Sequence, residues 1–472
     1  MTDNSTRLAL IGAGPGGYAA AFLAADLGMN VTLIDQELNP GGVCLYRGCI
    51  PSKALLHTAK LIDEAHQAKY WGIEYSDPKI DVARLRSWKE GVVKKLTAGL
   101  GQLAKQRKIE YIQGRATFEN SNTLRVRRAN GSEESLTFDR IIIATGSRPA
   151  VIPSLKLNTP RMMDSTSALD LSDVPSSLLV IGGGYIGLEL ATVYAALGSK
   201  VSVVEMLPGL LPGADRDLVL PLHKRMEKIF DSILLNTIVA AVKEESSGIR
   251  VTFDASELKE REKVFDKVLV SVGRKANSEI PGLEKTKVRV SERGFIQVNK
   301  QLQTDDPNVY AIGDVVGEPM LAHKASHEGR TAAEAIAGHK VAFEPNAIPA
   351  VVFTDPEIAW AGLTETQAQK DGREVKVARF PWAASGRAMT LDRTEGVTKL
   401  ILDPKSERVL GVGITGVGAG EMIAEGVLAI EMGATATDVA LTIHPHPTLS
   451  ETIMESAEIF FGTSTHVYRP KR

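Results

Sequence analysis

Two cysteines, Cys44 and Cys49, are the residues of this 472-residue chain whose type and spacing most directly indicate chemistry. They are the only cysteines in the sequence, and both lie within residues 41–53. Two thiols cannot complete a structural zinc site, which takes four ligands, so we expect no metal. A short turn containing Gly48 would bring the sulfurs within disulfide range, and in a reducing compartment such a pair is more often catalytic than structural. The alternative is two unrelated buried thiols.

Cys49 is the cysteine that the sequence places at the start of a helix. Pro51 suits the first turn of a helix that residues 54–59 continue. The positive end of the helix dipole favours the thiolate of Cys49. Thiol–disulfide exchange requires a thiolate, so this position suits redox chemistry.

A candidate base for that chemistry lies near the C-terminal end of the chain. His446 is followed five residues later by Glu451, and a histidine oriented by a carboxylate can accept a thiol proton. His444 is a competing candidate because it also follows an apolar run. A histidine with a nearby glutamate is more often structural, and spacing alone does not bring residue 446 to residue 44.

A glycine-rich repeat supplies the elements that must position these groups. Residues 8–35 and 178–205 match with a constant offset of 170, each predicting a strand, a glycine-rich turn, a helix and a second strand that ends in an acid. This is the pattern of a dinucleotide-binding βαβ unit, and two copies in register are far more specific than one. The matched residues are Gly12, Gly14, Gly17 and Asp35 in the first copy and Gly182, Gly184, Gly187 and Glu205 in the second.

Each matched position has a physical role in binding a dinucleotide. The first glycine permits a tight turn, the second lets a pyrophosphate approach the backbone, and the third lets helix and strand pack closely. The pyrophosphate then lies at the helix N-terminus. Asp35 and Glu205 can each accept hydrogen bonds from ribose hydroxyls. Because Glu205 would repel a 2′-phosphate and no arginine follows it in residues 206–208, we expect the second unit to prefer NAD to NADP.

The rest of the chain divides at changes of pattern. Buried-looking strands close on Gly146 and Gly273, and a strand ending at Asp314 precedes an alanine-rich helix over 322–338. From residue 348 alternating strand patterns mix with an apolar helix over 419–433, which predicts a separate α+β domain. We therefore expect an α/β protein with two Rossmann-like dinucleotide-binding domains and a C-terminal α+β dimerisation domain. The predicted boundaries are 1–150 and 151–280 for the two binding domains, 281–346 for a central segment completing the first site, and 347–472 for the C-terminal domain.

Composition excludes several other classes of protein. The 55 basic and 57 acidic residues give a net charge of −2, so we expect neither nucleic acid nor a membrane as partner. The uncharged stretch 8–25 is broken by glycines and Pro15, which argues against a membrane span. The first residues carry no signal or transit pattern, so we expect a cytoplasmic protein.

Several motifs together carry a family resemblance. They are GGVCLYRGCIPSK at 41–53, ATGSRP at 144–149, YAIGD at 310–314 and HPHPTLSE at 444–451, in addition to the two nucleotide units. With them the chain resembles the pyridine nucleotide–disulfide oxidoreductases from about residue 8 to residue 458. Within that family it is most similar to the enzymes that oxidise dihydrolipoamide with NAD⁺ through FAD and a redox disulfide.

The resemblance implies a role for each candidate residue. FAD would bind the first unit and NAD the second. Cys49 would be the thiolate beside the flavin, Cys44 the exposed sulfur that exchanges with substrate, and His446 the base that Glu451 orients. Lys53, paired with Glu189, would lie beside flavin N5. The implied FAD residues are Gly12, Gly14, Gly17, Asp35, Lys53, Thr145, Gly146, Asp314 and Ala325, and the implied NAD residues are Gly182, Gly184, Gly187, Glu205 and Gly273.

The resemblance also implies partners and leaves alternatives open. It implies an obligate homodimer in which the C-terminal domain of one subunit completes the active site of the other. Its protein substrate would be a lipoyl-bearing acyltransferase or a glycine-cleavage carrier protein, within 2-oxo acid dehydrogenase or glycine cleavage complexes. Tyr46, Arg47 and Tyr185 depart from the usual pattern, and Arg47 would place a cation near the exchanging sulfur. Another NAD(P)H-dependent disulfide reductase, similar to glutathione reductase, and a non-catalytic flavin and NAD redox sensor remain alternatives.

Overall fold

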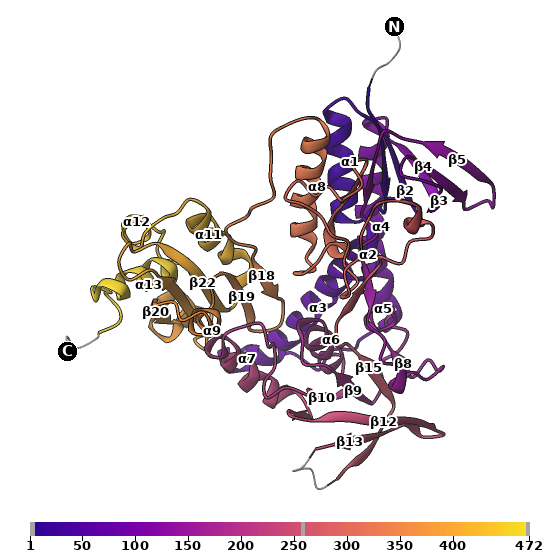
Figure 1. The fold of residues 1–472 in the computed structure, drawn as a ribbon. Coiled ribbons are helices and arrows are strands. Elements are labelled where there is room, and N and C mark those ends of the chain that lie inside the picture. The colour runs from indigo at the N-terminus through magenta and orange to yellow at the C-terminus, as the bar shows by residue number, and fades with distance from the viewer. Residues whose placement is uncertain (1–4, 256–259, 469–472) are drawn as a thin grey trace.

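The computed structural model describes residues 5–255 and 260–468. The outer ends of the first and last predicted domains, 1–4 and 469–472, lie outside that range. Within it the chain forms two α/β regions built on parallel strands and a C-terminal region built on an antiparallel sheet (Figure 1). This arrangement is the predicted fold class.

The first α/β region is organised around a seven-stranded sheet. Its strand order is β17-β6-β1-β2-β3-β4-β5, and β17, β6, β1, β2 and β3 pair in parallel. The bounds are β1 (Arg7–Ile11), β2 (Asn30–Asp35), β3 (Glu110–Phe118), β4 (Thr123–Arg128), β5 (Glu133–Thr137), β6 (Arg140–Ile143) and β17 (Val309–Ala311). Strand β17 comes from the predicted central segment, so this segment completes the first sheet.

Helix α8 (Ala322–Ile336) packs along α1 (Pro15–Asp26), as Figure 1 shows. Small residues allow this close approach. A Cβ added at Gly16 would lie 2.9 Å from the Ala325 carbonyl oxygen, and one at Gly329 would lie 2.5 Å from the Gly16 carbonyl oxygen. The predicted helix over 322–338 is therefore the second wall of the first nucleotide unit.

The second α/β region repeats the same local plan. Its sheet has the order β11-β10-β9-β15-β8, and a second sheet, β12-β13-β14, flanks it. The bounds are β8 (Met162–Met163), β9 (Ser177–Ile181), α6 (Tyr185–Ala196), β10 (Lys200–Val204), β11 (Ser232–Leu234), β12 (Ile238–Glu245), β13 (Gly248–Asp254), β14 (Glu262–Phe265) and β15 (Lys267–Val270). Elements β9, α6 and β10 occupy the places that β1, α1 and β2 have in the first region.

The repeat is also visible in backbone geometry. Gly12 and Gly182 have φ of 103° and 111°, which residues with a side chain rarely adopt. A Cβ at Gly12 would lie 2.3 Å from the Ala144 carbonyl oxygen, and one at Gly182 would lie 2.3 Å from the Ser271 carbonyl oxygen. Both turns therefore require glycine for the same two reasons.

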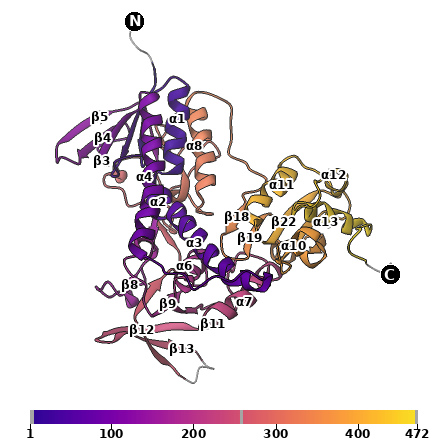
Figure 2. The same ribbon diagram turned by 180° about the vertical axis from the view of Figure 1, so that it is seen from behind.

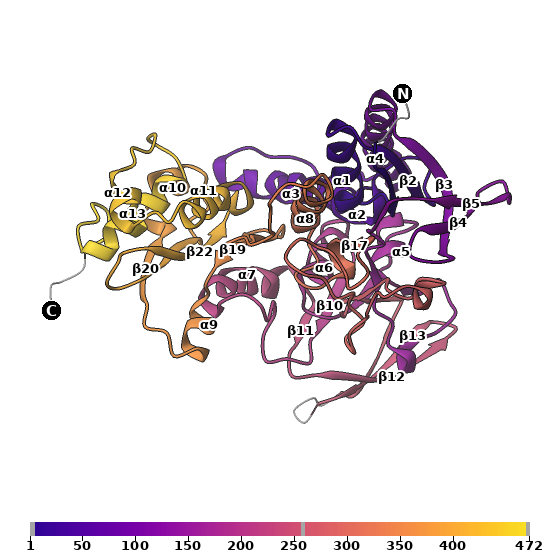
Figure 3. The same cartoon turned by 45° about the horizontal axis from the view of Figure 1, so that its top comes forward.

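The C-terminal region contains a five-stranded antiparallel sheet covered by helices. The strand order is β18-β19-β22-β21-β20. The bounds are β18 (Ala350–Val352), β19 (Glu357–Gly362), β20 (Lys376–Pro381), β21 (Val397–Leu402), β22 (Val409–Gly416), α11 (Ala419–Glu431), α12 (Ala436–Leu441) and α13 (Glu451–Phe461). Figures 2 and 3 show this region beside α7 (Arg216–Ile229) of the second region and far from β4 and β5.

A buried lysine fastens α7 to the C-terminal sheet. The Lys399 ammonium is 1% exposed and donates to Asp215 at 2.7 Å, Asp217 at 2.7 Å and Glu365 at 2.6 Å. These three carboxylates lie close enough together to resemble a metal site, but the ammonium stands among them. Arg379 pairs with two of the same acids. The network fixes the C-terminal region against the second α/β region.

Among the described residues, no helix has both the length and the apolar character that a membrane crossing requires.

Candidate active site

The two cysteines lie on consecutive helices. Cys44 is in α2 (Gly42–Arg47), and Cys49 begins α3 (Cys49–Gln67). The predicted turn is in fact this short helix followed by Gly48, where a Cβ would lie 2.9 Å from the Val43 carbonyl oxygen. The tight break at Gly48 brings the sulfurs within hydrogen-bonding range.

The two thiols have opposite acidities. A hydrogen bond from the Cys44 thiol stabilises the Cys49 thiolate and, with the Lys53 ammonium, lowers the pKa of Cys49 to about 7 against the opposing effect of burial. The same hydrogen bond, together with burial, raises the pKa of Cys44. When the reduced pair loses a proton near neutral pH, the thiolate therefore forms on Cys49 and the remaining proton stays on Cys44.

In the single chain, the exposure of the two cysteines differs from the roles that the resemblance implies. Cys49 is the exposed cysteine and Cys44 is half-buried. Both cysteines line one cavity. The assignment of Cys44 as the exchanging sulfur therefore rests on the acidity of the pair and on the resemblance, and not on exposure in the single chain.

This cavity, of about 380 Å³, lies between α1, α2, α3 and the central segment. All nine residues that the resemblance assigns to FAD line it, namely Gly12, Gly14, Gly17, Asp35, Lys53, Thr145, Gly146, Asp314 and Ala325. The N-terminus of α1 opens into it at Gly14, and a Cβ at the facing Gly42 would lie 2.5 Å from the Gly14 Cα. A helix N-terminus with close backbone access fits a dinucleotide pyrophosphate, so the residues present fit FAD.

The polar groups of the cavity wall are held by one another. Asp35 accepts hydrogen bonds from the backbone of Ala13 at 2.6 Å and of Glu37 at 2.9 Å. The Ser147 hydroxyl donates to Asp314 at 2.5 Å and accepts from Arg274 at 2.7 Å. Ser147 and Arg274 were not predicted, although each adjoins a glycine that was: Ser147 follows Gly146 and Arg274 follows Gly273.

Arg47, which lies between the two cysteines, has an acidic partner that the sequence did not indicate. Its guanidinium pairs with Glu37, and both residues line the cavity near Asp35. The largest influences on the pKa values of the cysteines are their mutual hydrogen bond and burial. The chain therefore directs Arg47 toward the cofactor cavity.

Lys53 and Glu189 meet across the two α/β regions. The Lys53 ammonium lies 2.8 Å from Glu189, whose side chain is 4% exposed. The other oxygen of Glu189 accepts a hydrogen bond from the backbone of Phe353 at 3.0 Å, and the Lys53 ammonium lies 4.4 Å from the centre of the Phe353 ring. All three parts of the chain thus converge at this pair.

The residues assigned to NAD lie at the carboxyl ends of β9, β10 and β15. Glu205 is buried and accepts hydrogen bonds from the backbone of Gly183 at 2.7 Å and of Leu207 at 2.8 Å. Among the described cavities, none is lined by Gly182, Gly184, Gly187, Glu205 or Gly273. The structure therefore places these five residues together at a sheet edge and outside the FAD cavity, which Tyr185 does line.

The two candidate histidines differ in accessibility. His446 Nδ1 lies 2.8 Å from Glu451, and its side chain is 73% exposed. Burial opposes ionisation of Glu451, but hydrogen bonds from the Thr448 backbone and from His446 hold its pKa below the ordinary value. His444 is 5% exposed, with Nδ1 2.8 Å from the Thr442 carbonyl oxygen and Nε2 2.7 Å from Glu425. Only His446 of the two has a ring nitrogen left for a substrate.

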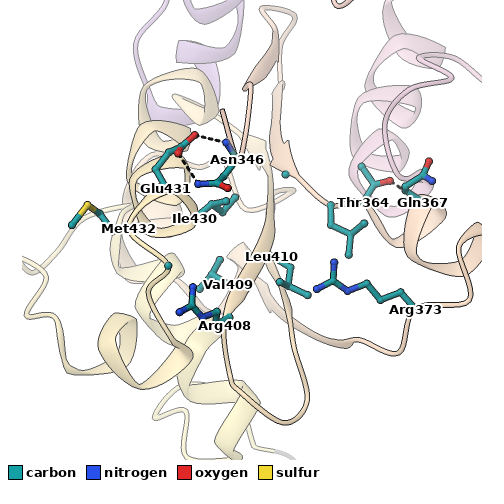
Figure 4. A pocket seen from close by; sticks show the side chains of 13 residues that line it. Asn346, Thr364, Gln367, Arg373, Arg408, Val409, Leu410, Ile430, Glu431 and Met432 are labelled. Atoms are coloured by element: carbon teal, nitrogen blue, oxygen red, sulfur yellow. Dashed lines mark hydrogen bonds between the residues drawn. The ribbon is translucent and has the colours of Figure 1, made fainter. Parts of the chain in front are cut away.

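Within one chain these histidines lie far from the cysteines. The loop before α13 is on the outer side of the C-terminal region, whereas α2 is in the first α/β region (Figures 1 to 3). A larger cavity of about 660 Å³ in the C-terminal region is lined by Arg373, Arg408 and Glu431 among others (Figure 4). It contains none of the predicted site residues.

Comparison with known proteins agrees with this geometry. The family model for pyridine nucleotide-disulphide oxidoreductases matches residues 6–329, and the model for the dimerisation domain of that family matches residues 348–457. The chain belongs to this family. Its members use FAD and NAD, so the chain is a flavoprotein disulfide oxidoreductase, and its dimerisation domain supports a homodimer.

Curated relatives extend over nearly the whole chain. A dihydrolipoyl dehydrogenase of Haemophilus influenzae is 49% identical over 99% of this chain and 97% of that protein. One of Vibrio cholerae is 48% identical over 98% of each. Among solved structures, LpdA from Mycobacterium tuberculosis has a TM-score of 0.89 at 26% identity, covering 96% of this chain and 99% of the other. The HOCl-induced flavoprotein disulfide reductase RclA from Escherichia coli has 0.84 at 29% identity, covering 95% and 98%.

Proposed function

We propose that this protein is a dihydrolipoyl dehydrogenase, which oxidises protein-bound dihydrolipoamide to lipoamide and reduces NAD⁺. The observation that carries the proposal is the asymmetric thiol pair: Cys44 and Cys49 hydrogen-bond to each other on the wall of a cavity that fits FAD. The curated relatives of that name, 48–49% identical over nearly the full length, support the choice of substrate.

The cysteines carry the exchange with substrate. A substrate thiolate attacks the Cys44 sulfur of the Cys44–Cys49 disulfide, and Cys49 leaves as a thiolate. The second substrate thiolate then attacks the substrate sulfur of the mixed disulfide, which releases lipoamide and Cys44. Because the pKa of Cys49 is lowered to about 7, Cys49 is a good leaving group at neutral pH.

His446 of the partner subunit accepts the proton of the attacking thiol. In this chain the Glu451 carboxylate, 2.8 Å from Nδ1, fixes the ring so that Nε2 is the nitrogen that takes the proton. One substrate proton is left on Cys44 and the other leaves through the histidine. The net reaction is dihydrolipoamide plus NAD⁺ giving lipoamide, NADH and a proton.

The remaining site residues position the cofactors. When bound, FAD supplies the two-electron chemistry that links the thiols to NAD⁺. The residues of the cavity wall hold it, with Lys53 fixed against Glu189 beside the thiolate. Glu205 directly follows β10 at the second site, where its carboxylate would repel a 2′-phosphate and so favour NAD over NADP.

Two assays test the substrate choice. The purified protein is expected to reduce NAD⁺ with dihydrolipoamide and to show no comparable oxidation of NADPH with glutathione disulfide. Activity in the second assay alone would overturn the proposal in favour of a glutathione-reductase-like enzyme. A non-catalytic redox sensor would turn over no dithiol, and its biological function would survive the Cys44→Ser substitution.

A mixed dimer tests whether two subunits share each site. Cys44→Ser homodimers should be inactive, and His446→Gln homodimers should keep at most about a hundredth of wild-type activity. After the two are dissociated and reassociated together, about half of the dimers are mixed and each holds one intact site, so activity should recover to roughly a quarter of wild type. No recovery would mean that cysteine and histidine act within one chain.

The protein partner and location are the finer parts of the proposal. A lipoyl-bearing acyltransferase of a 2-oxo acid dehydrogenase complex or a glycine-cleavage carrier protein would deliver the dihydrolipoamide, in the cytoplasm. The names of the curated relatives, which specify a dihydrolipoyl group, support a lipoyl-bearing partner. Co-purification with a lipoylated protein, detected with an antibody to lipoic acid, tests it. Recovery of the enzyme without any lipoylated protein would count against it.

A further inference from the structure

The stretch of chain that includes the first glycine-rich turn and would surround a bound pyrophosphate contains no basic residue from residue 8 to residue 46. Between Arg7 and Arg47 the sequence has three acids, Asp26, Asp35 and Glu37, and no lysine, arginine or histidine. Arg47 is therefore the first cation after the glycine-rich loop, and it stands between the two redox cysteines. Two of the acids, Asp35 and Glu37, line the FAD cavity.

The other cations of this cavity are engaged elsewhere. Lys53 pairs with the buried Glu189 at 2.8 Å. Arg274 donates to the Ser147 hydroxyl at 2.7 Å and to the Ser147 carbonyl oxygen at 2.8 Å. Neither of these partner residues lies in residues 35–48, the segment that begins at Asp35, the carboxylate expected to bind a ribose. Among the described residues lining the cavity, Arg47 is the cation of that segment.

Neighbouring contacts hold Arg47 at the rim of the cavity. Its guanidinium pairs with Glu37, and the Glu37 carbonyl oxygen accepts a hydrogen bond from Tyr111 at 2.9 Å. The adjacent Tyr46 hydroxyl donates to the Asn39 carbonyl oxygen at 3.1 Å. Segment 36–39 and helix α2 are thus tied together by two successive side chains. Arg47 keeps enough exposure, at 39%, to reach a bound anion.

We propose that Arg47 is a FAD-binding residue that offsets the two carboxylates Asp35 and Glu37 and attracts the FAD diphosphate. FAD carries a negative diphosphate into a region where the chain itself adds two acids, so a cation there favours binding. Because Arg47 lies in α2 with Cys44, the same contact links occupancy by FAD to the position of the exchanging sulfur. The inference rests on the FAD chemistry of the proposed function and adds a specific residue to it.

The test is the rate of FAD release from diluted holoenzyme, followed by the rise of flavin fluorescence. Arg47→Met removes the charge but keeps much of the side-chain length, and release should be about 10- to 100-fold faster, which is the usual effect of losing a charge-assisted hydrogen bond. Arg47→Lys keeps the charge, so its rate of FAD release should lie between those of wild type and Arg47→Met. Raising the salt concentration should accelerate release from wild type more than from Arg47→Met.

Two further variants separate a charge effect from a structural one. In Glu37→Gln the amide oxygen can still accept from Arg47 but one negative charge is gone, so FAD should be held as tightly as in wild type or more tightly. Tyr46→Phe removes the Asn39 contact without changing charge and should leave the salt dependence of release intact. Amide hydrogen exchange over 36–48 should be slowed by FAD in wild type and less so in Arg47→Met.

The outcomes are decisive in both directions. Equal rates of FAD release from wild type and Arg47→Met would overturn the inference. Equal acceleration of FAD release by Arg47→Met and Glu37→Gln would also overturn it, because the Arg47–Glu37 ion pair would then act only by holding the structure together. A wild-type enzyme that fails to oxidise dihydrolipoamide would instead refute the proposed function and leave the FAD measurements valid.

Discussion

The acidity of Cys49 can be tested by changing one atom of its neighbour. The hydrogen bond from the Cys44 thiol is the largest cause of the lowered pKa of Cys49. Cys44→Ala removes that donor, whereas Cys44→Ser replaces the thiol by a hydroxyl that can still donate. The pair of variants therefore separates the hydrogen bond from all other consequences of losing Cys44.

The expected shift is large enough to measure by alkylation. With the donor kept, the pKa of Cys49 should stay near the value of about 7, and without it the pKa should rise toward the ordinary 9.0. At pH 7 the thiolate fraction then falls from about one half to about one hundredth, so alkylation slows by about 50-fold. Burial raises the pKa of Cys49 in both variants, so it does not contribute to the difference between their pKa values.

The measurement is the pH dependence of the alkylation rate of Cys49 in the anaerobic holoenzyme, read by mass spectrometry. Midpoints rather than absolute rates are compared, because the bound cofactor limits access equally in both variants. The reasoning fails if the alanine and serine variants titrate together. It also fails if the serine variant has its midpoint near 9.

Four other expectations follow from the same structure. His446→Gln should lower kcat/KM for dihydrolipoamide by roughly 10²- to 10⁴-fold without faster FAD release, whereas a full rate would move the role of base elsewhere. Lys399→Met should reduce the free energy of unfolding by about 3–5 kcal/mol in urea titrations, because three carboxylates lose their buried counter-ion, and a change below 1 kcal/mol would contradict this reading. Burial opposes ionisation of Asp215, but the Lys399 hydrogen bond lowers the pKa of Asp215 to about 2. The stability that ionised Asp215 contributes should be complete above the unfolded pKa of about 3.9 and should be lost as the pH falls through 2. Unfolding of Asp215→Asn in acid titrations should therefore lack this pH-dependent loss of stability. Glu205→Ala should lower the ratio of kcat/KM for NAD⁺ to kcat/KM for NADP⁺. An unchanged ratio would show that Glu205 does not set the preference for NAD⁺.

Local rules predicted the elements that the sequence repeats. The strand, glycine turn, helix and acid at 8–35 and 178–205 follow from steric and dipole requirements that act within about 30 residues, and both copies formed. The C-terminal helix over 419–433 and the antiparallel strands around it also follow from patterning. The redox segment was predicted less completely, since Cys44 lies in the short helix α2 where the sequence indicated a turn.

Long-range contacts explain what the sequence left open. Nothing near Arg47 in the sequence indicates that its charge is directed to Glu37, because their contact depends on how α2 packs beside the end of β2. The choice between His444 and His446 likewise depends on burial: Glu425 on α11 engages one ring, and the other is left accessible beside Glu451. The network around Lys399 joins residues up to 184 positions apart.

The two nucleotide units also show how one local plan gives a resident cofactor and an exchanging one. In the first, Gly42 approaches Gly14 and α8 approaches Gly16, so the chain closes a cavity around the pyrophosphate position. In the second, a Cβ at Gly184 would meet no atom within 4 Å, and none of the described cavities is lined by the residues assigned to NAD. Closure buries more of a ligand and slows its release. With the cofactors assigned as proposed, we therefore expect the first unit to retain FAD and the second to release NAD, and the difference arises from elements outside the repeat.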